Sequence, residues 1–540
     1  MAVITEQSSD KSGSLARGVA VFSSWTMLSR ILGLVRDMLW FYSFPRDVMG
    51  AFLFAFRIPN TFRGLVAEGA ANAAYVPVFS EYFATKSREQ TARLIGAVTT
   101  VTVGILTLMT VAGIIFAPVL TVFVRGLQHV SEGPGPSEEN LALTIALTRS
   151  VFPYLFLIGV ATLGTGLLTA LKSFGPPAFA PVLFNIAIIA ACLTLRHTLP
   201  IPSLVIGVLI GGAAQLLLQV GALAMRGIRF RFSRAIAHPG VKTMGLLMLP
   251  AVFGQAIGEI NLLVDAFFAD SLGPEKVQSL YGANRLLQLP LGVFGVAIST
   301  VALSTMSTHA ARGEMRELLE TLRRALRMAC FMAFPASVGL IVLRVPVIRL
   351  LFQHGAYFDE TATAETARAL VFYLMGMASF AAVKTAVSAF YAIKETRVPV
   401  TCASISMLAN VAMNFMLVRP LQLGGLALAT TLSFTLNLLL LMIMLRRRLG
   451  PLGMQQLVRA VSRIGVSTAI MGVCAWIVLR TMLSVTSSSR ISGQIVQVGV
   501  PLVVGLGVYL ACCRLFRIQE IEEFLSGFLK RYPSKAAMSQ

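Results

Sequence analysis

Charged residues are scarce in this chain of 540 residues, because Asp, Glu, Lys and Arg together make up only 13% of it. Soluble domains carry about 25%. Negative charges are the scarcer kind, because the chain has 24 Asp and Glu but 45 Lys and Arg. The mean hydropathy is +0.77 and 56% of the residues are apolar, enough for a dozen or more spans of roughly 20 residues each. A soluble enzyme is therefore excluded, and the sequence predicts an all-α polytopic membrane protein.

Motifs of covalent and metal chemistry are also missing. The six cysteines lie in apolar stretches without metal-ligand spacing, the five histidines are scattered, and no glycine-rich phosphate loop is present. We therefore expect no catalytic residues, no enzyme activity, no resident cofactor and no nucleic-acid partner. Residues 1–16 are polar and lack the apolar segment of a cleaved signal peptide.

Apolar runs separated by short polar or Pro/Gly breaks predict about 14 transmembrane helices. Lys and Arg gather in every second connection, for example at Arg226, Arg229 and Arg231, whereas the connection that holds Glu138 and Glu139 is acidic. Because cytoplasmic loops are rich in Lys and Arg, this alternation predicts that both termini are cytoplasmic.

A weak internal repeat accompanies the span pattern. The segments TALKSFGPPAFAPV and YAIKETRVPVTCAS each place a lysine, Lys172 or Lys394, five residues before a proline at the start of an apolar helix. Parallel repeats that flank a midplane site are typical of transporters.

Several arginines fall inside predicted spans, where one central Arg costs about 2.5–3.5 kcal/mol. The positions that matter most are Arg30, Arg36, Arg63 and Arg285, with Gln288 one turn after Arg285. An interior lined by these side chains would be cationic and would suit a phosphate or pyrophosphate group, which guanidinium binds in bidentate geometry. Two structural alternatives stay open: Arg36 pairs with a nearby carboxylate, and Arg57 extends to the membrane interface.

A second polar set consists of Asp265, Asn410, Asn414 and Thr430 in otherwise apolar spans. One carboxylate, amide carbonyls and a hydroxyl would make an oxygen cage for Na⁺. The alternative is interhelical hydrogen bonding, which Asn and Thr commonly provide in membrane bundles.

Long ordered motifs identify the chain's relatives. TMLSRILGLVRD, AFRIPNTFRGLVAEGAANAAYVPVFSEY, YGANRLLQLPLGVFGVAIST and GGLALATTLSF, among others across residues 15–450, resemble the MurJ/MviN family of bacterial lipid II flippases. This family is part of the multidrug/oligosaccharidyl-lipid/polysaccharide exporter superfamily.

The resemblance implies two six-helix lobes in a V-shaped bundle plus two C-terminal helices. Under it the chain divides into a cytoplasmic N-terminal tail (1–16), an N-lobe (17–226), a basic cytoplasmic linker (227–242), a C-lobe (243–448), helices 13 and 14 lining a lipid groove (449–517) and a cytoplasmic tail (518–540).

The same resemblance implies transport of lipid II from the inner to the outer leaflet of the bacterial inner membrane, in peptidoglycan synthesis. The headgroup would lie on Arg30, Arg36, Arg63, Arg285 and Gln288, and the set headed by Asp265 would form a sodium site. Partners would be lipid II, membrane lipids and other cell-wall synthesis proteins, with Na⁺ or H⁺ as the coupling ion.

This chain departs from the family pattern at several charges. Gly50 stands where Asp is common, Gly64 where a second Arg is common, and Gln288 where some members have Glu. Asn414 stands where Asp is common, which leaves Asp265 as the only evident carboxylate of the ion site.

Rival functions stay open at this stage. A flippase for another polyprenyl-linked glycan would use the same pyrophosphate handle, whereas a drug or cation antiporter of the same fold would need an acidic cavity. A non-transporting scaffold would have no use for intramembrane arginines, and a glycosyltransferase would need paired acids in a loop.

Overall fold

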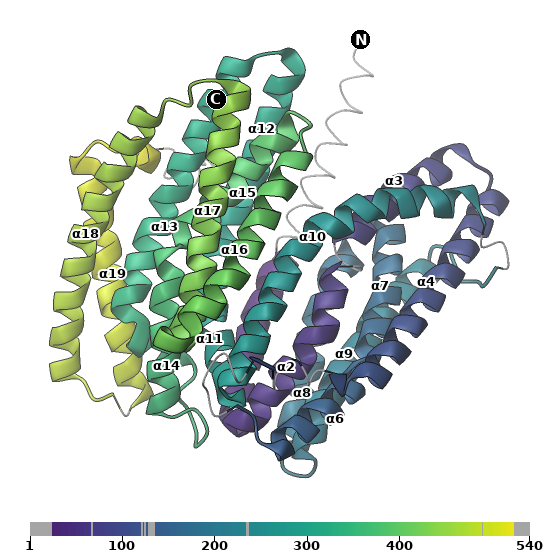
Figure 1. Ribbon diagram of the computed structural model, residues 1–540, viewed down its shortest axis with the longest axis horizontal. Coiled ribbons are helices and arrows are strands. Elements are labelled where there is room, and N and C mark those ends of the chain that lie inside the picture. Colours follow the sequence, from purple (N-terminus) through teal and green to yellow (C-terminus); the bar gives the residue numbers. More distant parts are fainter. Residues whose placement is uncertain are drawn as a thin grey trace, which may run out of the picture. The chain divides into compact units, whose positions relative to one another are not determined.

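The computed structural model describes residues 24–65, 69–119, 123, 126–127, 135–233, 237–488 and 490–522. These residues form helices joined by short connections and include no strand (Figure 1). The predicted all-α class is therefore confirmed. By packing the chain forms two compact units, Met1–Gln278 with Gly355–Phe358, and Ser279–His354 with Asp359–Gln540.

The first unit begins with a helix over residues 24–43. It continues through α2 (Arg46–Arg63), α3 (Gly69–Thr85), α4 (Arg88–Phe116), α6 (Glu138–Val151), α7 (Pro153–Ala170), α8 (Gly175–Leu195), α9 (Pro200–Ala224) and α10 (Pro239–Leu272). Helix α9 packs on α7 and α8, and α10 packs on α2 and α3. The packing boundary thus falls one helix later than the predicted linker at 227–242. The lobes expected from the sequence are defined by membrane topology, and their division stays a prediction.

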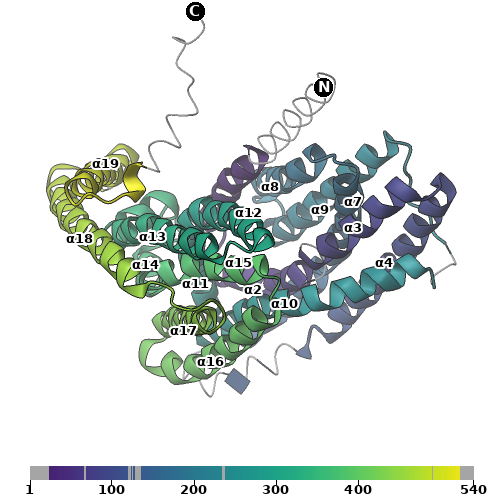
Figure 2. The same cartoon turned by 90° about the horizontal axis from the view of Figure 1, so that it is seen from above.

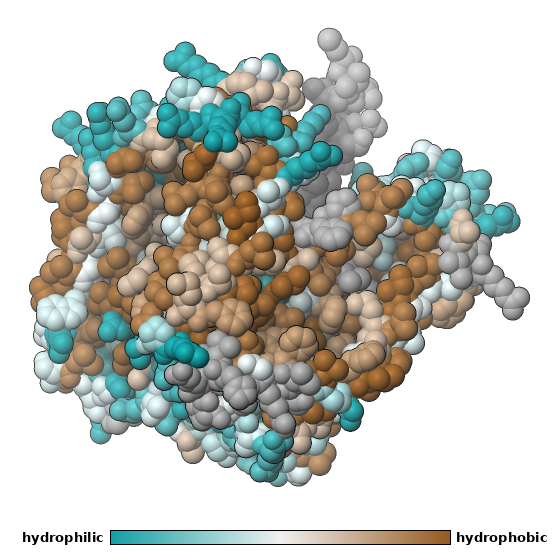
Figure 3. Space-filling model, in the orientation of Figure 1, coloured by the Kyte–Doolittle hydropathy of each residue, from teal (hydrophilic) through white to brown (hydrophobic). Residues whose placement is uncertain are grey.

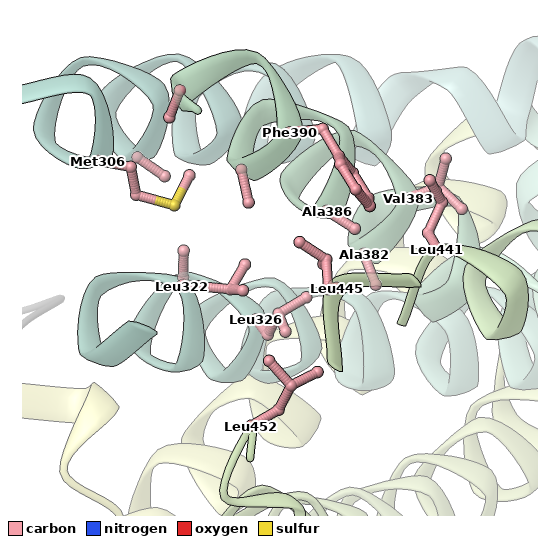
Figure 4. Packing of buried hydrophobic residues seen from close by; sticks show 14 of the residues in the cluster. Met306, Leu322, Leu326, Ala382, Val383, Ala386, Phe390, Leu441, Leu445 and Leu452 are labelled. Atoms are coloured by element: carbon pink, nitrogen blue, oxygen red, sulfur yellow. The ribbon is translucent and has the colours of Figure 1, made fainter. Parts of the chain in front are cut away.

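The second unit follows α11 (Pro274–Pro290), which crosses the packing boundary. It contains the π-helical turn η2 (Leu291–Gly295), α12 (Val296–Arg312), α13 (Met315–Leu351), α14 (Glu360–Met375), α15 (Met377–Ala392), α16 (Arg397–Leu421), α17 (Leu423–Leu449), α18 (Met454–Val485) and α19 (Ile491–Leu515). Met306, Leu326, Phe390 and Leu445 point toward one another between α12, α13, α15 and α17 in its apolar core (Figure 4).

The last two helices form a pair within the second unit. Helices α18 and α19 lie side by side against α13 (Figure 2). The Tyr509 hydroxyl donates a 2.7 Å hydrogen bond to the Phe331 carbonyl, and Arg327 forms a 2.8 Å ion pair with buried Glu520. These two bonds fix α19 and the residues after it to α13.

Membrane-spanning helices account for most of the described chain. In the part of the chain that the structure describes, nine helical segments are long and apolar enough to cross a membrane, with α6 and α7 counted as one (Glu138–Ala170). The pair α14 and α15, bent by 44°, makes a tenth if it is counted as one span. On the visible face hydrophobic residues cover the middle of the helices and hydrophilic residues gather at their ends (Figure 3). Four further predicted spans, at 24–43, α2–α3, α10 and α11–α12, carry charges or breaks. The helices are thus consistent with 14 spans, and that count stays a prediction.

Both segments of the internal repeat adopt the same turn. Lys172 and Lys394 have left-handed backbones, with φ of 58° and 61°, a conformation that residues other than Gly seldom adopt. Each lysine ends one helix and precedes the next, and the following residue closes the turn with a hydrogen bond to the carbonyl five residues earlier. These bonds are Ser173 to Leu168 at 2.8 Å and Glu395 to Phe390 at 2.9 Å.

Gly50 lets α2 approach the turn between α10 and α11. A Cβ atom at this position would overlap the backbone carbonyl of Pro274. The backbone cannot move aside as a side chain can, so the Asp that the family resemblance led us to expect at this position does not fit the packing of this chain.

We predict that Gly50→Ala lowers the free energy of unfolding by about 1–3 kcal/mol through overpacking. The matched control is Gly104→Ala on α4, where a Cβ meets no atom within 4 Å; Ala should be neutral or stabilise the helix by up to about 1 kcal/mol. Thermal unfolding in detergent measures both variants, and equal unfolding temperatures would contradict the close packing of Gly50.

Candidate functional site

Three of the residues predicted to bind the headgroup lie on irregular helices. Helix α2 contains Pro59, and α11 ends at Pro290 and continues into the π-helical turn η2. π-Helical turns are rare and occur frequently at functional sites. These irregular helices also carry Arg63, Arg285 and Gln288.

Arg36 on the helix 24–43 is buried, with 8% of its surface exposed. Its Nη2 lies 2.6 Å from Asp37 Oδ1, its Nε donates to the same oxygen at 2.9 Å, and its Nη1 donates to Asn185 Oδ1 at 3.2 Å. The guanidinium carbon lies 4.5 Å from the centre of the Trp40 ring. Asp37 therefore neutralises Arg36 within the first unit, which favours the alternative that Arg36 pairs with a nearby carboxylate.

Asn185 holds this ion pair between two helices. Its Nδ2 donates to the Ser29 carbonyl at 3.0 Å and to the Pro181 carbonyl at 3.1 Å. The amide oxygen is thereby oriented toward Arg36, and α8 is fixed to the helix that carries both Arg30 and Arg36.

Arg30 and Arg63 differ from Arg36. Arg30 is half-buried and forms no ion pair within the described part of the chain. Arg63, in the last turn of α2, donates from Nε to Asn60 Oδ1 at 2.8 Å. That bond uses one of the five guanidinium N–H groups and orients the remainder of the fork.

Helix α10 contributes acids to the same unit. Glu259 lies against Gly64, because a Cβ at residue 64 would come 2.6 Å from Glu259 Oε1. Asp265 and Asn261 are buried on α10, at 2% and 6% exposure. Glu259 was not predicted as a site residue, although an acid two residues before Asn261 in an apolar helix was a visible signal.

In the second unit, cationic and polar side chains lie on the helices around η2. Arg285 is half-buried and Gln288 exposed on α11. The exposed Lys384 of α15 passes next to Gly295 of η2, because its Cδ lies 4.0 Å from the Cβ position of that glycine. Lys384 was also missed, and its signal was a lysine inside the apolar run AAVKTAV.

Three members of the predicted ion site come together in the second unit. Asn414 donates to Asn410 Oδ1 at 3.0 Å, and Asn410 donates to Thr430 Oγ1 at 3.4 Å. Both asparagines are fully buried and Thr430 is 5% exposed. Their amide and hydroxyl oxygens are suitable ligands for Na⁺. The same hydrogen bonds equally fit the alternative in which these residues only link the helices. Asp265 belongs to the first unit, so its approach to these residues stays a prediction.

A transition-metal centre finds no support in the described residues, where no three His, Cys, Asp or Glu side chains could hold a metal ion together.

Comparison with known proteins gives one consistent family. The sequence model described as "Lipid II flippase MurJ" matches residues 44–492. A "Probable lipid II flippase MurJ" of Vibrio cholerae is 34% identical over 526 residues, which cover 94% of this chain and 97% of the relative. A "Lipid II flippase MurJ" of Burkholderia cenocepacia is 33% identical over 441 residues, which cover 80% of this chain and 84% of the relative.

Solved structures agree with the sequence comparison. The structure titled "Lipid II flippase MurJ, inward closed conformation" has a TM-score of 0.77 and 27% identity, and covers 92% of this chain and 98% of its own. An inward-facing multidrug resistance MATE family transporter of the MOP superfamily has a TM-score of 0.66 at 16% identity, and covers 80% of this chain and 98% of its own. This second likeness supports the fold alone. The chain is thus a multi-pass membrane protein that belongs to the lipid II flippase MurJ family.

Proposed function

We propose that this protein moves lipid II from the inner to the outer leaflet of the bacterial inner membrane by alternating access. The observation that carries the proposal is family membership over nearly the whole chain. The arginines inside its spans support the same function. No covalent bond forms or breaks, and the process is transport rather than catalysis.

The physical task is to carry a pyrophosphate-linked sugar headgroup across hydrocarbon while the polyprenyl tail stays in lipid. An unpaired pyrophosphate in hydrocarbon would cost many kcal/mol, which cationic side chains in a cavity offset. We assign this role to Arg30, Arg63 and Arg285, with Gln288 as a polar neighbour. Arg36 would join them only in a state in which its bonds to Asp37 and Asn185 open.

The rival functions differ in the charge that they require. A flippase for another polyprenyl-linked glycan would use the same cationic groups, so the family match favours lipid II over it. A drug or cation antiporter would need an acidic cavity, which the arginines oppose. The proposed partners are lipid II, membrane lipids and other cell-wall synthesis proteins.

Complementation tests the function and its residues together. We expect the wild-type chain to restore growth of a bacterium depleted of its own lipid II flippase. Arg285→Ala should abolish rescue, since loss of one partner of a desolvated charge pair costs about 2 kcal/mol or more. Arg285→Lys should also impair rescue, because Lys lacks the bidentate fork. Full rescue by Arg285→Ala would remove Arg285 from the headgroup site.

Arg36 and Asp37 provide the matched control for a structural charge. Arg36→Ala leaves buried Asp37 without its partner, so we expect low accumulation of this variant in the membrane. The double variant Arg36→Ala/Asp37→Ala removes both charges and should accumulate like the wild type. Immunoblots of membranes measure accumulation, and an equally depleted double variant would contradict the pairing role of Arg36.

The proposed topology places both termini in the cytoplasm, on the basis of the loop charges. Reporters fused after Ser137 and after Arg229 should therefore report the periplasm and the cytoplasm. Signals from the same side would refute the span count between them.

Energy coupling is proposed to run through Asp265. A buried acid in an apolar helix costs a few kcal/mol unless it is paired or neutralised. Either Na⁺, with oxygens of Asn410, Asn414 and Thr430, or a proton would neutralise it. Because the site has one carboxylate, a bound Na⁺ only neutralises it, and we expect the affinity for Na⁺ to be modest. An inward-negative potential favours the return of positive charge toward the cytoplasm, at about 2.3 kcal/mol per charge per 100 mV.

We predict that Asp265→Asn leaves headgroup binding intact and slows resetting of the carrier. The measurement is lipid II transport in vesicles, with and without a sodium gradient and an imposed potential. Asn410→Ala serves as a comparison that removes an amide oxygen but no charge. Transport by Asp265→Asn that equals wild type under every condition would reduce Asp265 to a packing residue.

A further inference from the structure

A slot in the first unit opens between α4 and α9 and has α7 as its floor. Its volume is about 590 Å³, within the range of about 300–1,000 Å³ for small-molecule sites. The lining residues are Thr107, Thr110 and Val111 of α4, Pro153, Phe156 and Leu157 of α7, and Leu209, Ile210 and Ala213 of α9. We call it the Thr110 slot.

Close packing above and below holds the Thr110 slot open. On one side of it Leu106 of α4 contacts Gly159 of α7, and on the other side Gly113 of α4 contacts Phe152. Val111 and Ile210, on opposite walls, are 46% and 53% exposed. The slot therefore faces the hydrocarbon of the membrane and is accessible to a lipid chain.

One wall carries a polar group without a partner. Thr110 is 9% exposed, and its Oγ1 has no hydrogen-bond partner in the part of the chain that the structure describes. Thr99 and Thr100 on the same helix instead donate to carbonyls four residues earlier, at 2.7 and 2.9 Å. A buried hydroxyl without a partner costs about 1–3 kcal/mol, so a ligand with an acceptor oxygen would be favoured here.

A cation lies next to the slot. Arg149, exposed near the end of α6, donates from Nε to the Ile114 carbonyl of α4 at 3.2 Å. Ile114 is one helical turn beyond Thr110, about 6 Å along the axis. Both Nη groups of Arg149 lack partners among the described residues, and they present a fork that suits phosphate oxygens.

The depth of these groups matches a phospholipid. Thr110 lies about 33 Å along α4 from Arg88, and the hydrocarbon core is about 30 Å thick. Arg93, also exposed at that end of α4, is about 26 Å from Thr110, so with Arg88 and Arg93 at one surface Thr110 lies in the opposite leaflet, on the side of its ester groups. Arg149, which is bonded one turn farther out at Ile114, can extend its side chain from there toward the lipid phosphates.

We propose that the Thr110 slot is a binding site for an anionic, ester-linked phospholipid of the leaflet at the Arg149 end. Arg149 binds the phosphate, the Thr110 hydroxyl donates to an ester carbonyl, and one acyl chain fills the apolar slot. A polyprenyl lipid has the phosphate and the chain but no ester, and it would leave Thr110 without a partner. The site is distinct from the arginines assigned to the lipid II headgroup.

Native mass spectrometry of the full chain in mild detergent tests this site with two probes, diacyl phosphatidylglycerol and its dialkyl ether analogue. The wild type should bind the first equivalent of the diacyl lipid more tightly, on the order of fivefold for one hydrogen bond. Thr110→Val should remove this difference. Thr194→Val is the matched control, because the exposed Thr194 hydroxyl donates to the Ala190 carbonyl.

Two further variants test the phosphate and the chain. Arg149→Gln should weaken both lipids, whereas Arg490→Gln, which removes an equal charge from another exposed site, should not. Ala213→Phe should fill the slot and exclude both lipids. If the wild type bound the diacyl lipid and its ether analogue equally, the proposal would be overturned, whatever the variants showed. Retention of the first equivalent by both Arg149→Gln and Ala213→Phe would also overturn it.

Discussion

A charge inside a bilayer must be paired, hydrated or in contact with a ligand, because hydrocarbon can neither solvate it nor form hydrogen bonds with it. Arg36 shows the first solution, since Asp37, Asn185 and the Trp40 ring surround its guanidinium. Arg30 has no ion pair in the described part of the chain, which leaves its charge available. The proposed transport of a pyrophosphate headgroup draws on this difference between Arg36, which holds two helices together, and Arg30.

The irregular helices follow from the same constraint. Interruptions at Pro59, at Pro290 and η2, and in the bent pair α14–α15 weaken the regular backbone. Irregular backbone at membrane depth is tolerated where it is buried in protein or lines a cavity. Three of the four predicted spans that carry charges or breaks, α2–α3, α10 and α11–α12, also carry Arg63, Asp265 and Arg285, whereas Arg30 lies on the fourth, and Asn410, Asn414 and Thr430 lie on α16 and α17.

Much of the fold followed from composition and span pattern, since hydropathy depends on local sequence. The shared turn at Lys172 and Lys394 also had a sequence signal in the repeat. The partner of Arg36 did not, because Asn185 is 149 residues away and nothing in either segment specifies that contact. Likewise, the contact of Gly50 with the Pro274 backbone depends on how α2 meets the α10–α11 turn. Lys384 and Glu259 could be recognised in the sequence as charges in apolar runs. The residues that they contact in the fold, Gly295 and Gly64, could not be predicted from the sequence.

Transport by the purified protein tests the central claim most directly. The chain would be reconstituted in vesicles with a fluorescent lipid II and, separately, a fluorescent phospholipid of similar size, and the fraction reaching the opposite leaflet followed over time. The account predicts protein-dependent movement of lipid II and none of the phospholipid, because only the pyrophosphate-linked headgroup engages the arginines. Equal movement of both lipids, or no movement of lipid II by folded protein, would contradict it.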